Sequence, residues 1–311
     1  MLELINFDNW VEADGLPEGS GTSEKIWLRS PSGTECGLFK FPKTQGLPDG
    51  TQTISTEHIS EWLAYRLGKL LGISCAKVTL GYRNNRIGSL GTLITEPGTD
   101  LVEGVNFIRE KFPCYDAKNM IDTKTNTYYC LEHILQSTQD FLPSQPWIEM
   151  LLFDFLIGNA DRHQSNWALL KTSDQESLPY VKCPLYDNGS SLCCYVPDNH
   201  LDLLFGKDSG PMRRLTDTGS FSMIRINGSV KKRPTHRHVA QYVLHQYPRI
   251  AIPIASGFIK RLSHGTLSAI LSELPDSIFP PIRKELVTQY IEAKTAILAS
   301  LISQEGGTMY G

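Results

Sequence analysis

Hydrophobic and polar positions alternate in several short segments of the first third of the chain. Segments 24–30 and 36–42 have this strand-like pattern, and the sequence SPSG between them is typical of a turn. Segments 76–82 and 90–96 are also strand-like, with the polar sequence RNNRIG as the turn between them. The pattern therefore predicts a hairpin and two further strands in one small sheet.

Segment 56–72 has helical spacing instead. Ser55 or Thr56 is available as its N-cap, and Gly72 is suited to its end. The apolar stripe of this helix consists of Ile59, Leu63, Leu67 and Leu70. We expect this helix to lie against the sheet in an N-terminal lobe, residues 1–97, because Pro and Gly in EPGTD mark a boundary there.

The remaining part, residues 98–311, is mainly helical in pattern. YYCLEHILQ and PWIEMLLFDFLIG predict two helices, and the tail at 252–303 predicts two or three more. One segment alone, 166–187, breaks this character with two short strand-like runs. Since a chain of 311 residues exceeds what one core supports, we expect two lobes with a ligand cleft between them.

Composition is ordinary for a globular protein, with 41% hydrophobic and 20% charged residues and a net charge of −3. That charge gives no global attraction to nucleic acid or to a membrane, and no apolar run approaches 18 residues. The seven cysteines are irregularly spaced, so reduced thiols in a cytoplasmic protein are expected. Adjacent Cys193 and Cys194 suggest metal or redox chemistry only weakly, because no second cluster accompanies them.

The stretch LIGNADRHQSNW (156–167) carries the first candidate chemistry. Asp161 and Asn166 follow a predicted helix, and a predicted hairpin then leads to Asp187 in LYDNG. Phosphoryl transfer from ATP needs a carboxylate for the acceptor hydroxyl and oxygen ligands for magnesium. Asp161 fits the first role, and Asn166 with Asp187 fits the second, although helix caps and turns are the alternative for each fragment.

The same chemistry needs a cation on the phosphates and a backbone cradle. Lys40 is flanked by apolar residues in a predicted strand, where an edge-strand charge is the alternative role. Before it, GLPEGSGTSEK contains Gly15, Gly19 and Gly21, whose backbone permits close approach to phosphate. We place the adenine near LITEP (93–97).

Two neighbours of Asp161 have alternative roles. His163 is interpreted as a hydrogen bonder that braces the loop, and Arg162 as either a phosphate contact or a surface charge. A helix glutamate normally holds the phosphate lysine, and both Glu57 and Glu61 are available. Periodicity places Glu61 opposite the apolar stripe, where a solvated glutamate also lies, so it does not decide between them.

LLFDFLIGNADRHQSNWALL followed by PLYDNGSSL resembles the HipA-like kinases, which share the N-x-D-x-H-x-x-N pattern. Phosphatidylinositol kinases have a related D-R-H-x-x-N. SEWLAYRLGKLLGI and FKFPK also resemble the HipA-like glutamate helix and lysine strand. The similarity is strong over 145–195, fair over 19–75 and thin beyond 200. The chain resembles a core-only, HipT-like member of the family.

The resemblance implies an α+β, bilobal protein-kinase-like fold and residue roles to match. Asp161 would be the catalytic base, Lys40 the phosphate contact and Glu61 its positioning partner, with Asn166 and Asp187 as magnesium ligands. GTSEK would be the Gly-rich loop, in which Ser20, Thr22 or Ser23 is a candidate for autophosphorylation, although Ser23 replaces a common glutamine. The residues expected to bind ATP are Gly19, Ser20, Gly21, Thr22, Ser23, Lys40, Glu96, His163, Asn166 and Asp187.

The function implied is ATP- and Mg²⁺-dependent phosphorylation of a protein serine or threonine. The family resemblance further implies a toxin–antitoxin context, an antitoxin partner, and inhibition of translation through a target such as an aminoacyl-tRNA synthetase. A lipid or small-molecule kinase and a nucleotide-binding pseudokinase stay open as alternatives. Nucleic-acid binding through KKRPTHRH (231–238) is disfavoured, because so short a basic run in a chain with net charge −3 is more typical of a solvated loop.

Overall fold

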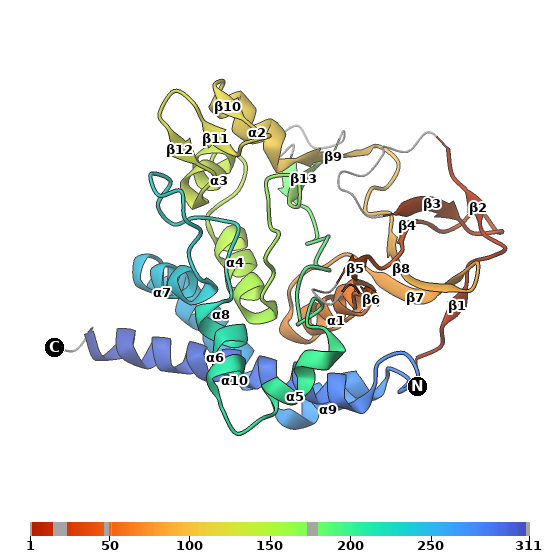
Figure 1. Cartoon of the computed structure of the whole chain (residues 1–311). Coiled ribbons are helices and arrows are strands. Elements are labelled where there is room, and N and C mark those ends of the chain that lie inside the picture. The colour runs from red at the N-terminus through yellow and green to blue at the C-terminus, as the bar shows by residue number, and fades with distance from the viewer. Residues whose placement is uncertain (1, 15–23, 47–49, 51, 173–179, 309–311) are drawn as a thin grey trace.

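The computed structural model describes residues 2–14, 24–46, 50, 52–172 and 180–308. A β-rich N-terminal part stands beside a larger, mainly helical C-terminal part, as expected from the pattern of the sequence (Figure 1). Five of the expected ATP contacts lie outside the described residues: Gly19, Ser20, Gly21, Thr22 and Ser23.

A six-stranded sheet forms the N-terminal part, with the strand order β1-β7-β8-β4-β3-β2. All neighbours in it are antiparallel except β1 and β7, which run parallel. Its strands are β1 (Ile5–Asn6), β2 (Val11–Glu12), β3 (Lys25–Arg29), β4 (Cys36–Lys40), β7 (Val78–Arg83) and β8 (Arg86–Thr92). A separate hairpin, β5 (Thr44–Gly46) with β6 (Gln52–Ile54), leads into helix α1 (Glu57–Leu71).

Alternation along β4 explains why Lys40 faces away from the small aromatic core. Phe39 is fully buried, and its ring packs edge-on against Phe7 and Phe41, with ring centroids 5.3 and 4.9 Å apart. Because successive side chains of a strand point to opposite faces, Lys40 emerges on the other face. That face is covered by α1, which packs on β7 and β8.

Helix α1 begins and ends where the sequence predicted. Thr56 is its N-cap, and Gly72 ends it in the left-handed conformation with φ 80°. The helix is buried on more than its apolar stripe, since Ser60 and Glu61 are also buried. Ser60 Oγ donates to the Ser191 carbonyl at 3.0 Å and the Asn188 amide donates to Glu61 Oε2 at 3.0 Å, so segment 188–191 covers this side of the helix.

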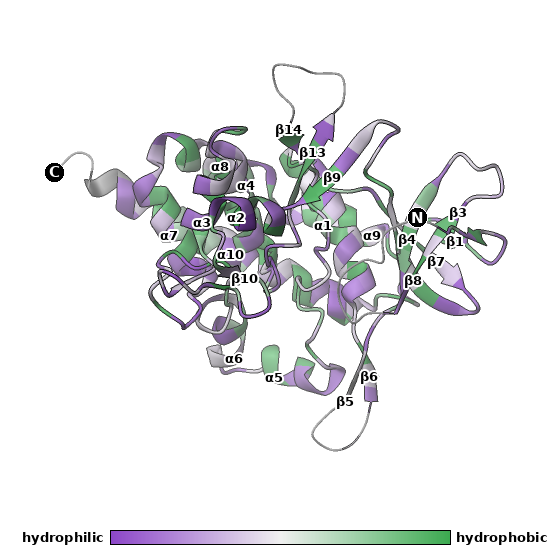
Figure 2. Ribbon diagram, turned by 90° about the horizontal axis from the view of Figure 1, so that it is seen from above, coloured by the Kyte–Doolittle hydropathy of each residue, from purple (hydrophilic) through white to green (hydrophobic). Residues whose placement is uncertain are grey.

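The C-terminal part contains two small sheets and the remaining helices. A three-stranded sheet in the order β14-β13-β9 lies between the two parts, as the view from above shows (Figure 2). The strands of this part are β9 (Thr99–Glu103), β10 (Tyr115–Asp116), β11 (Ile121–Asp122), β12 (Thr127–Tyr128), β13 (Ala168–Thr172) and β14 (Tyr180–Lys182). Its helices are α2 (Gly104–Lys111), α3 (Leu131–Thr138), α4 (Gln145–Ile157), α5 (Leu201–Leu204), α6 (Gly210–Arg213), α7 (His236–Gln246), α8 (Pro248–Arg261), α9 (His264–Ser272) and α10 (Pro281–Thr308), with short turns η1 (Asp198–His200) and η2 (Arg214–Thr218).

Helix α4 is the centre of the C-terminal part. Ten of its residues are buried, and α7, α8 and α10 pack around it. A helix that is apolar all round has to lie inside a protein, so its composition explains its place. Asp154 is the only charged residue among these ten, and it determines how the next loop is anchored.

Four expectations about these elements were wrong in detail. Strand β8 begins at Arg86, so only Asn84 and Asn85, both with positive φ, form the turn predicted over RNNRIG. Helix α3 begins at Leu131, after the short strand β12. Segment 166–187 is not the only β segment of this part, because β9–β12 precede it. The last helices begin at Pro248, earlier than the 252–303 expected for the tail.

Within the described part of the chain, no helix is both long enough and apolar enough to cross a membrane.

Candidate active site

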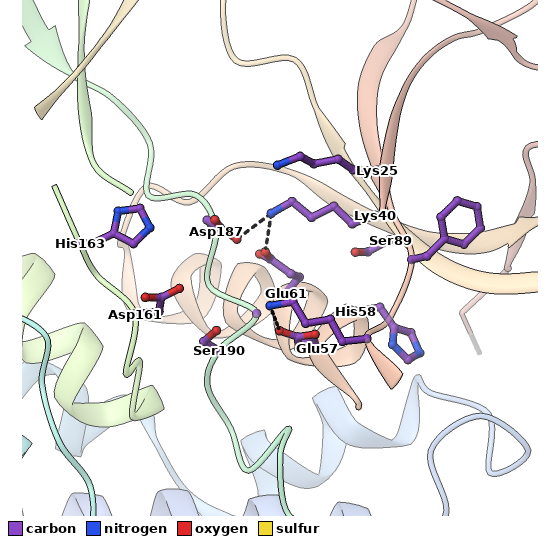
Figure 3. Close-up of a pocket in the computed structure, with 13 residues that line it drawn as sticks. Lys25, Lys40, Glu57, His58, Glu61, Ser89, Asp161, His163, Asp187 and Ser190 are labelled. Atoms are coloured by element: carbon purple, nitrogen blue, oxygen red, sulfur yellow. Dashed lines mark hydrogen bonds and ion pairs between the residues drawn. The ribbon is translucent and has the colours of Figure 1, made fainter. Parts of the chain in front are cut away.

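A cavity of about 190 Å³ lies between the sheet with α1 on one side and two loops of the C-terminal part on the other. Lys40 reaches into it from β4 and Glu61 from α1, while Asp161 and Asp187 come from the loops (Figure 3). Four residues separated by up to 147 positions in the sequence therefore converge on one space.

Lys40 holds the two sides of the cavity together. Its Nζ donates to Asp187 Oδ1 at 2.7 Å and to Glu61 Oε1 at 3.2 Å. Burial alone disfavours the charged ammonium, but the two carboxylates outweigh it and raise the pKa of Lys40. In turn, Lys40 overcomes the effect of burial on Asp187 and lowers the pKa of that carboxyl to about 2.

Of the two candidate glutamates on α1, Glu61 is the one that contacts Lys40. Its second oxygen, Oε2, accepts a hydrogen bond from the Asn188 amide at 3.0 Å. Burial raises the pKa of Glu61, an effect that Lys40 opposes. Glu57 is engaged elsewhere: it accepts from Ser55 Oγ at 2.9 Å and pairs with Lys43 Nζ at 3.2 Å.

Asp161 stands in the loop that follows α4. The helix ends at Gly158 in the left-handed conformation, φ 68°, and Asn159 Oδ1 then accepts the Asp161 amide at 3.0 Å. Asn166 Nδ2 donates to the Asp161 carbonyl at 2.8 Å, so the backbone of Asp161 is fixed on both sides. Burial raises the pKa of the Asp161 carboxyl, which lines the cavity. A raised pKa brings a carboxylate nearer the range in which a general base works.

Arg162 was expected to be a phosphate contact or a surface charge, and it is neither. It is 1% exposed and is not among the described residues that line the cavity, so it is neither in solvent nor placed to contact a phosphate there. Nη2 donates to Asp154 Oδ1 at 2.8 Å and to Asn188 Oδ1 at 2.6 Å. Nη1 donates to the carbonyls of Asn166 and Tyr186, at 2.8 Å each.

This network joins helix α4, the Asp161 loop and the Asp187 segment. Breaking such a buried ion pair by removing one partner is strongly destabilising. One signal in the sequence could have indicated the arrangement: an aspartate in a mainly apolar helix needs a buried cation nearby, and Arg162 is eight positions from Asp154.

Asn166 has the chemistry of a metal ligand. Its Oδ1 is buried and has no hydrogen-bond partner among the described residues. An unpaired buried carbonyl oxygen costs free energy, which a cation ligand would offset. Asp187 has a positive φ of 54°, a conformation that aspartate tolerates, and presents an ionised carboxylate to the cavity. The two residues thus fit the oxygen-rich donor set that magnesium takes.

Of the remaining residues expected to bind ATP, one lines the cavity and one does not. His163 lines the cavity, and its Nδ1 accepts the Ser165 amide at 3.2 Å, which matches the loop-bracing role predicted for it. Glu96 is exposed in the connection between β8 and β9, and it is not among the described residues that line the cavity. Lys25 and Lys43 do line it, although no pattern in the sequence singled them out.

Known proteins resemble this chain in sequence and in fold. A model of the HipA-like C-terminal domain matches residues 18–249. The chain belongs to this HipA-like family. The serine/threonine-protein kinase CtkA of Helicobacter pylori strain J99 is 30% identical over 135 residues, which are 43% of this chain and 40% of CtkA. The match therefore spans well under half the length of that relative.

Solved structures extend the likeness of the HipA-like fold to nearly the whole chain. The crystal structure of the H. pylori proinflammatory kinase CtkA matches with a TM-score of 0.78 at 18% identity, covering 97% of this chain and 98% of CtkA. HipA in the Shewanella oneidensis MR-1 complex of HipA, HipB and operator DNA matches with a TM-score of 0.54 at 14% identity, covering 93% and 66%. The expected α+β, kinase-like fold is thereby confirmed.

Two helices hold the loop before Asp161 from below the cavity: α7, which lies inside the matched residues, and α10, which lies beyond them. His236 and Lys294 are buried, and both contact Ser220 Oγ at 2.9 Å, one through Nδ1 and the other through Nζ. His236 Nε2 lies 2.9 Å from the Asn159 carbonyl. Burial lowers the pKa of His236 to about 3, so the ring is neutral. Because a carbonyl only accepts, Nε2 carries the proton.

Proposed function

We propose that this chain is an ATP-dependent serine/threonine protein kinase that uses the cavity around Lys40. The observation that carries the proposal is the double contact of Lys40 with Asp187 and Glu61, which assembles a cation and two acids opposite the Asp161 carboxylate. Phosphoryl transfer needs positioning and charge stabilisation more than covalent chemistry, and this set supplies both.

In this mechanism Lys40 binds phosphate oxygens, and Glu61 keeps its ammonium aimed at them. Asp161 accepts the proton of the acceptor hydroxyl as the new O–P bond forms and the bond to the leaving ADP breaks. Asn166 and Asp187 would hold magnesium, which neutralises charge on the phosphates when bound. Lys25 and Lys43, on the same cavity, would add positive charge for a triphosphate.

The relatives support a kinase-like enzyme and extend the proposal to its acceptor and its partners. CtkA carries the name of a serine/threonine-protein kinase, and HipA was solved with HipB as a toxin–antitoxin system. By that likeness we propose a protein serine or threonine as acceptor, including one in the Gly-rich loop, and an antitoxin protein as partner. Inhibition of translation would be the outcome in the cell.

The test is incubation of the whole chain with labelled ATP and Mg²⁺, followed by mass spectrometry. Phosphate on serine or threonine of the chain, or of an added protein, supports the proposal if it is lost in Asp161→Asn. Label in extractable lipid or in small molecules instead would point to the alternative kinase chemistry. Nucleotide binding without any transfer would indicate a pseudokinase and contradict the proposal.

A further inference from the structure

A cluster of basic residues borders the Asp161 loop on the side away from the sheet. Arg233 Nη1 donates to the carbonyl of Ala160, the residue immediately before Asp161, at 3.3 Å. Lys231 and Lys232 precede it and are exposed, as is Arg233 itself. The basic run is therefore not one solvated loop, because His236 is buried at the start of helix α7 while these three residues face solvent.

The loop that carries these residues is held in place by its backbone. Arg225 Nε and Nη2 donate to the Lys231 carbonyl at 3.0 and 2.7 Å. The Ser222 amide donates to the Pro234 carbonyl at 3.0 Å, and Thr235 then caps α7 through the His238 amide. A surface loop fixed in this way loses little further backbone entropy when a ligand binds, so only its side chains still have to be ordered.

Within the described chain, Lys231, Lys232 and Arg233 form no ion pair with a carboxylate, although Arg233 lies near enough to Asp161 to oppose the effect of burial, which raises the pKa of that carboxyl. Arg225 is 9% exposed, yet its hydrogen bonds go to the carbonyls of Lys231 and Tyr129 rather than to a carboxylate. Arg233 likewise contacts the Ala160 carbonyl and Met223 Sδ. By contrast, Arg237, four positions further on, pairs with Asp217 at 2.9 Å. Burial and then the charge of Arg233 lower the pKa of Arg225, so the two guanidiniums repel each other.

The position and the charge of Lys231, Lys232 and Arg233 together indicate which partner binds this surface. A hydroxyl that reaches Asp161 belongs to a polypeptide whose neighbouring residues must pass close to Ala160, and therefore close to Arg233. Two residues of extended chain span at most about 7 Å, so Lys231 and Lys232 are within reach of the same polypeptide. Opposite charges across such a rim favour encounter and select between partners.

Resting on the proposed function, we propose that Lys231, Lys232 and Arg233 form an acidic-peptide docking site, so that the kinase selects serines or threonines flanked by aspartate or glutamate. The occupant is the acceptor protein itself. A chain with net charge −3 has no general attraction for polyanions, so the preference has to arise at this local surface.

The test compares three synthetic peptides that share one serine and differ only in acidic, neutral or basic flanks. For the wild-type chain we expect kcat/KM to be about tenfold higher for the acidic peptide than for the neutral one, and the ratio to fall with added salt. In the double variant K231E/K232E the ratio should fall to one or below. Since the ratio is taken within each variant, a general loss of activity cancels.

A matched control carries the same change of charge elsewhere. K69E/K111E alters two exposed lysines on α1 and α2, and it should keep the wild-type ratio. Equal kcat/KM for acidic and neutral peptides in the wild type would overturn the docking site. So would a ratio that K231E/K232E and K69E/K111E lower equally.

Binding measured without catalysis separates this inference from the proposed function. Fluorescence anisotropy with the acidic peptide should show binding that K231E/K232E weakens about tenfold. If that holds while no phosphate is transferred to any acceptor, the kinase proposal fails and the docking site stands. If a DNA duplex binds instead and K231E/K232E abolishes it, the acidic-peptide site is overturned in favour of nucleic acid.

Discussion

The two walls of the cavity are built in different ways. The wall from the C-terminal part rests on buried groups, since Arg162 and Asp154 are 1% and 2% exposed and are hydrogen-bonded on several sides. The opposite wall carries Lys40 and Lys43, whose side chains are 27% and 38% exposed and which are held by ion pairs. The acids and amides are therefore preorganised by the core, whereas the cations are placed by the acids they contact.

The largest expected effect on the rate of phosphate transfer comes from replacing Asp161, the acid that faces the cavity. Asp161→Asn should lower the rate of phosphate transfer by about 10²–10⁴-fold, the contribution typical of a positioned general base. Thermal stability should stay equal or rise, because burial raises the pKa of this carboxyl and so disfavours its charged form. Rate assays and thermal melts of the same preparation check both. A variant that unfolds would contradict the view that Asp161 is supported by the wall rather than part of the support.

Arg162→Met tests the buried support directly. It leaves Asp154 charged and unpaired, which should cost about 3–5 kcal/mol of unfolding free energy. The matched control is Arg237→Met, whose pair with Asp217 is 36% exposed on the arginine side and should cost at most about 1 kcal/mol. Urea unfolding measures both, and equal losses would mean that the Arg162 network is no stronger than a surface pair.

On the opposite wall, Glu61→Gln should lower activity less than Asp161→Asn does. It weakens one charged hydrogen bond to Lys40 while Asp187 still holds the ammonium, so we expect about a 10-fold to 100-fold loss in kcat/KM for ATP. Glu57→Gln is the control on the same helix, and its loss should be smaller because Glu57 does not contact Lys40. A larger loss in the control would reverse the assignment of the two glutamates.

The smallest effect concerns pH and Lys294 beneath the wall. Burial lowers the pKa of Lys294 to about 7, so between pH 7 and 9 the unfolded chain binds more protons at this residue than the folded one. Stability should therefore rise over that interval, by about 2 kcal/mol relative to Lys294→Met. Unfolding curves at pH 7 and 9 for both proteins give the difference. A parallel change in both would show that Lys294 does not titrate as its burial requires.

Patterns in the sequence were sufficient for elements whose ends carry local signals. Helix α1 was predicted almost to the residue because Gly72 ends it, and β4 because apolar residues alternate around Lys40. Strands β9–β12 were missed because most span only two residues, too few for a period to show. Periodicity did not decide the role of Glu61, because the spacing within one helix contains no information about the segment that covers it, in which the Asn188 amide donates to Glu61 Oε2.

The residues of the candidate site likewise fall into those that the sequence predicted and those that it did not. The order of Asp161, Asn166 and Asp187 suggested one site, and the structure brings Asp161 and Asp187 to one cavity. Arg162 was misjudged because its role depends on Asp154, a neighbour only in the folded chain. Lys25 and Lys43 were not singled out, since a lysine on a cavity has the same sequence signature as one in solvent. Interactions between distant segments thus mark the limit of what local pattern predicts.

The close approach of Gly158 to helix α10 has a practical consequence for preparing the protein. A Cβ at Gly158 would overlap the Tyr290 hydroxyl, so loop and helix are fitted to each other with no room for a side chain. The family match ends at residue 249, before Tyr290 and Lys294. A recombinant fragment truncated at that limit would leave the backbone at Gly158 without Tyr290, which packs against it. Inactivity of such a fragment would therefore reflect where it was cut rather than the chemistry of the cavity.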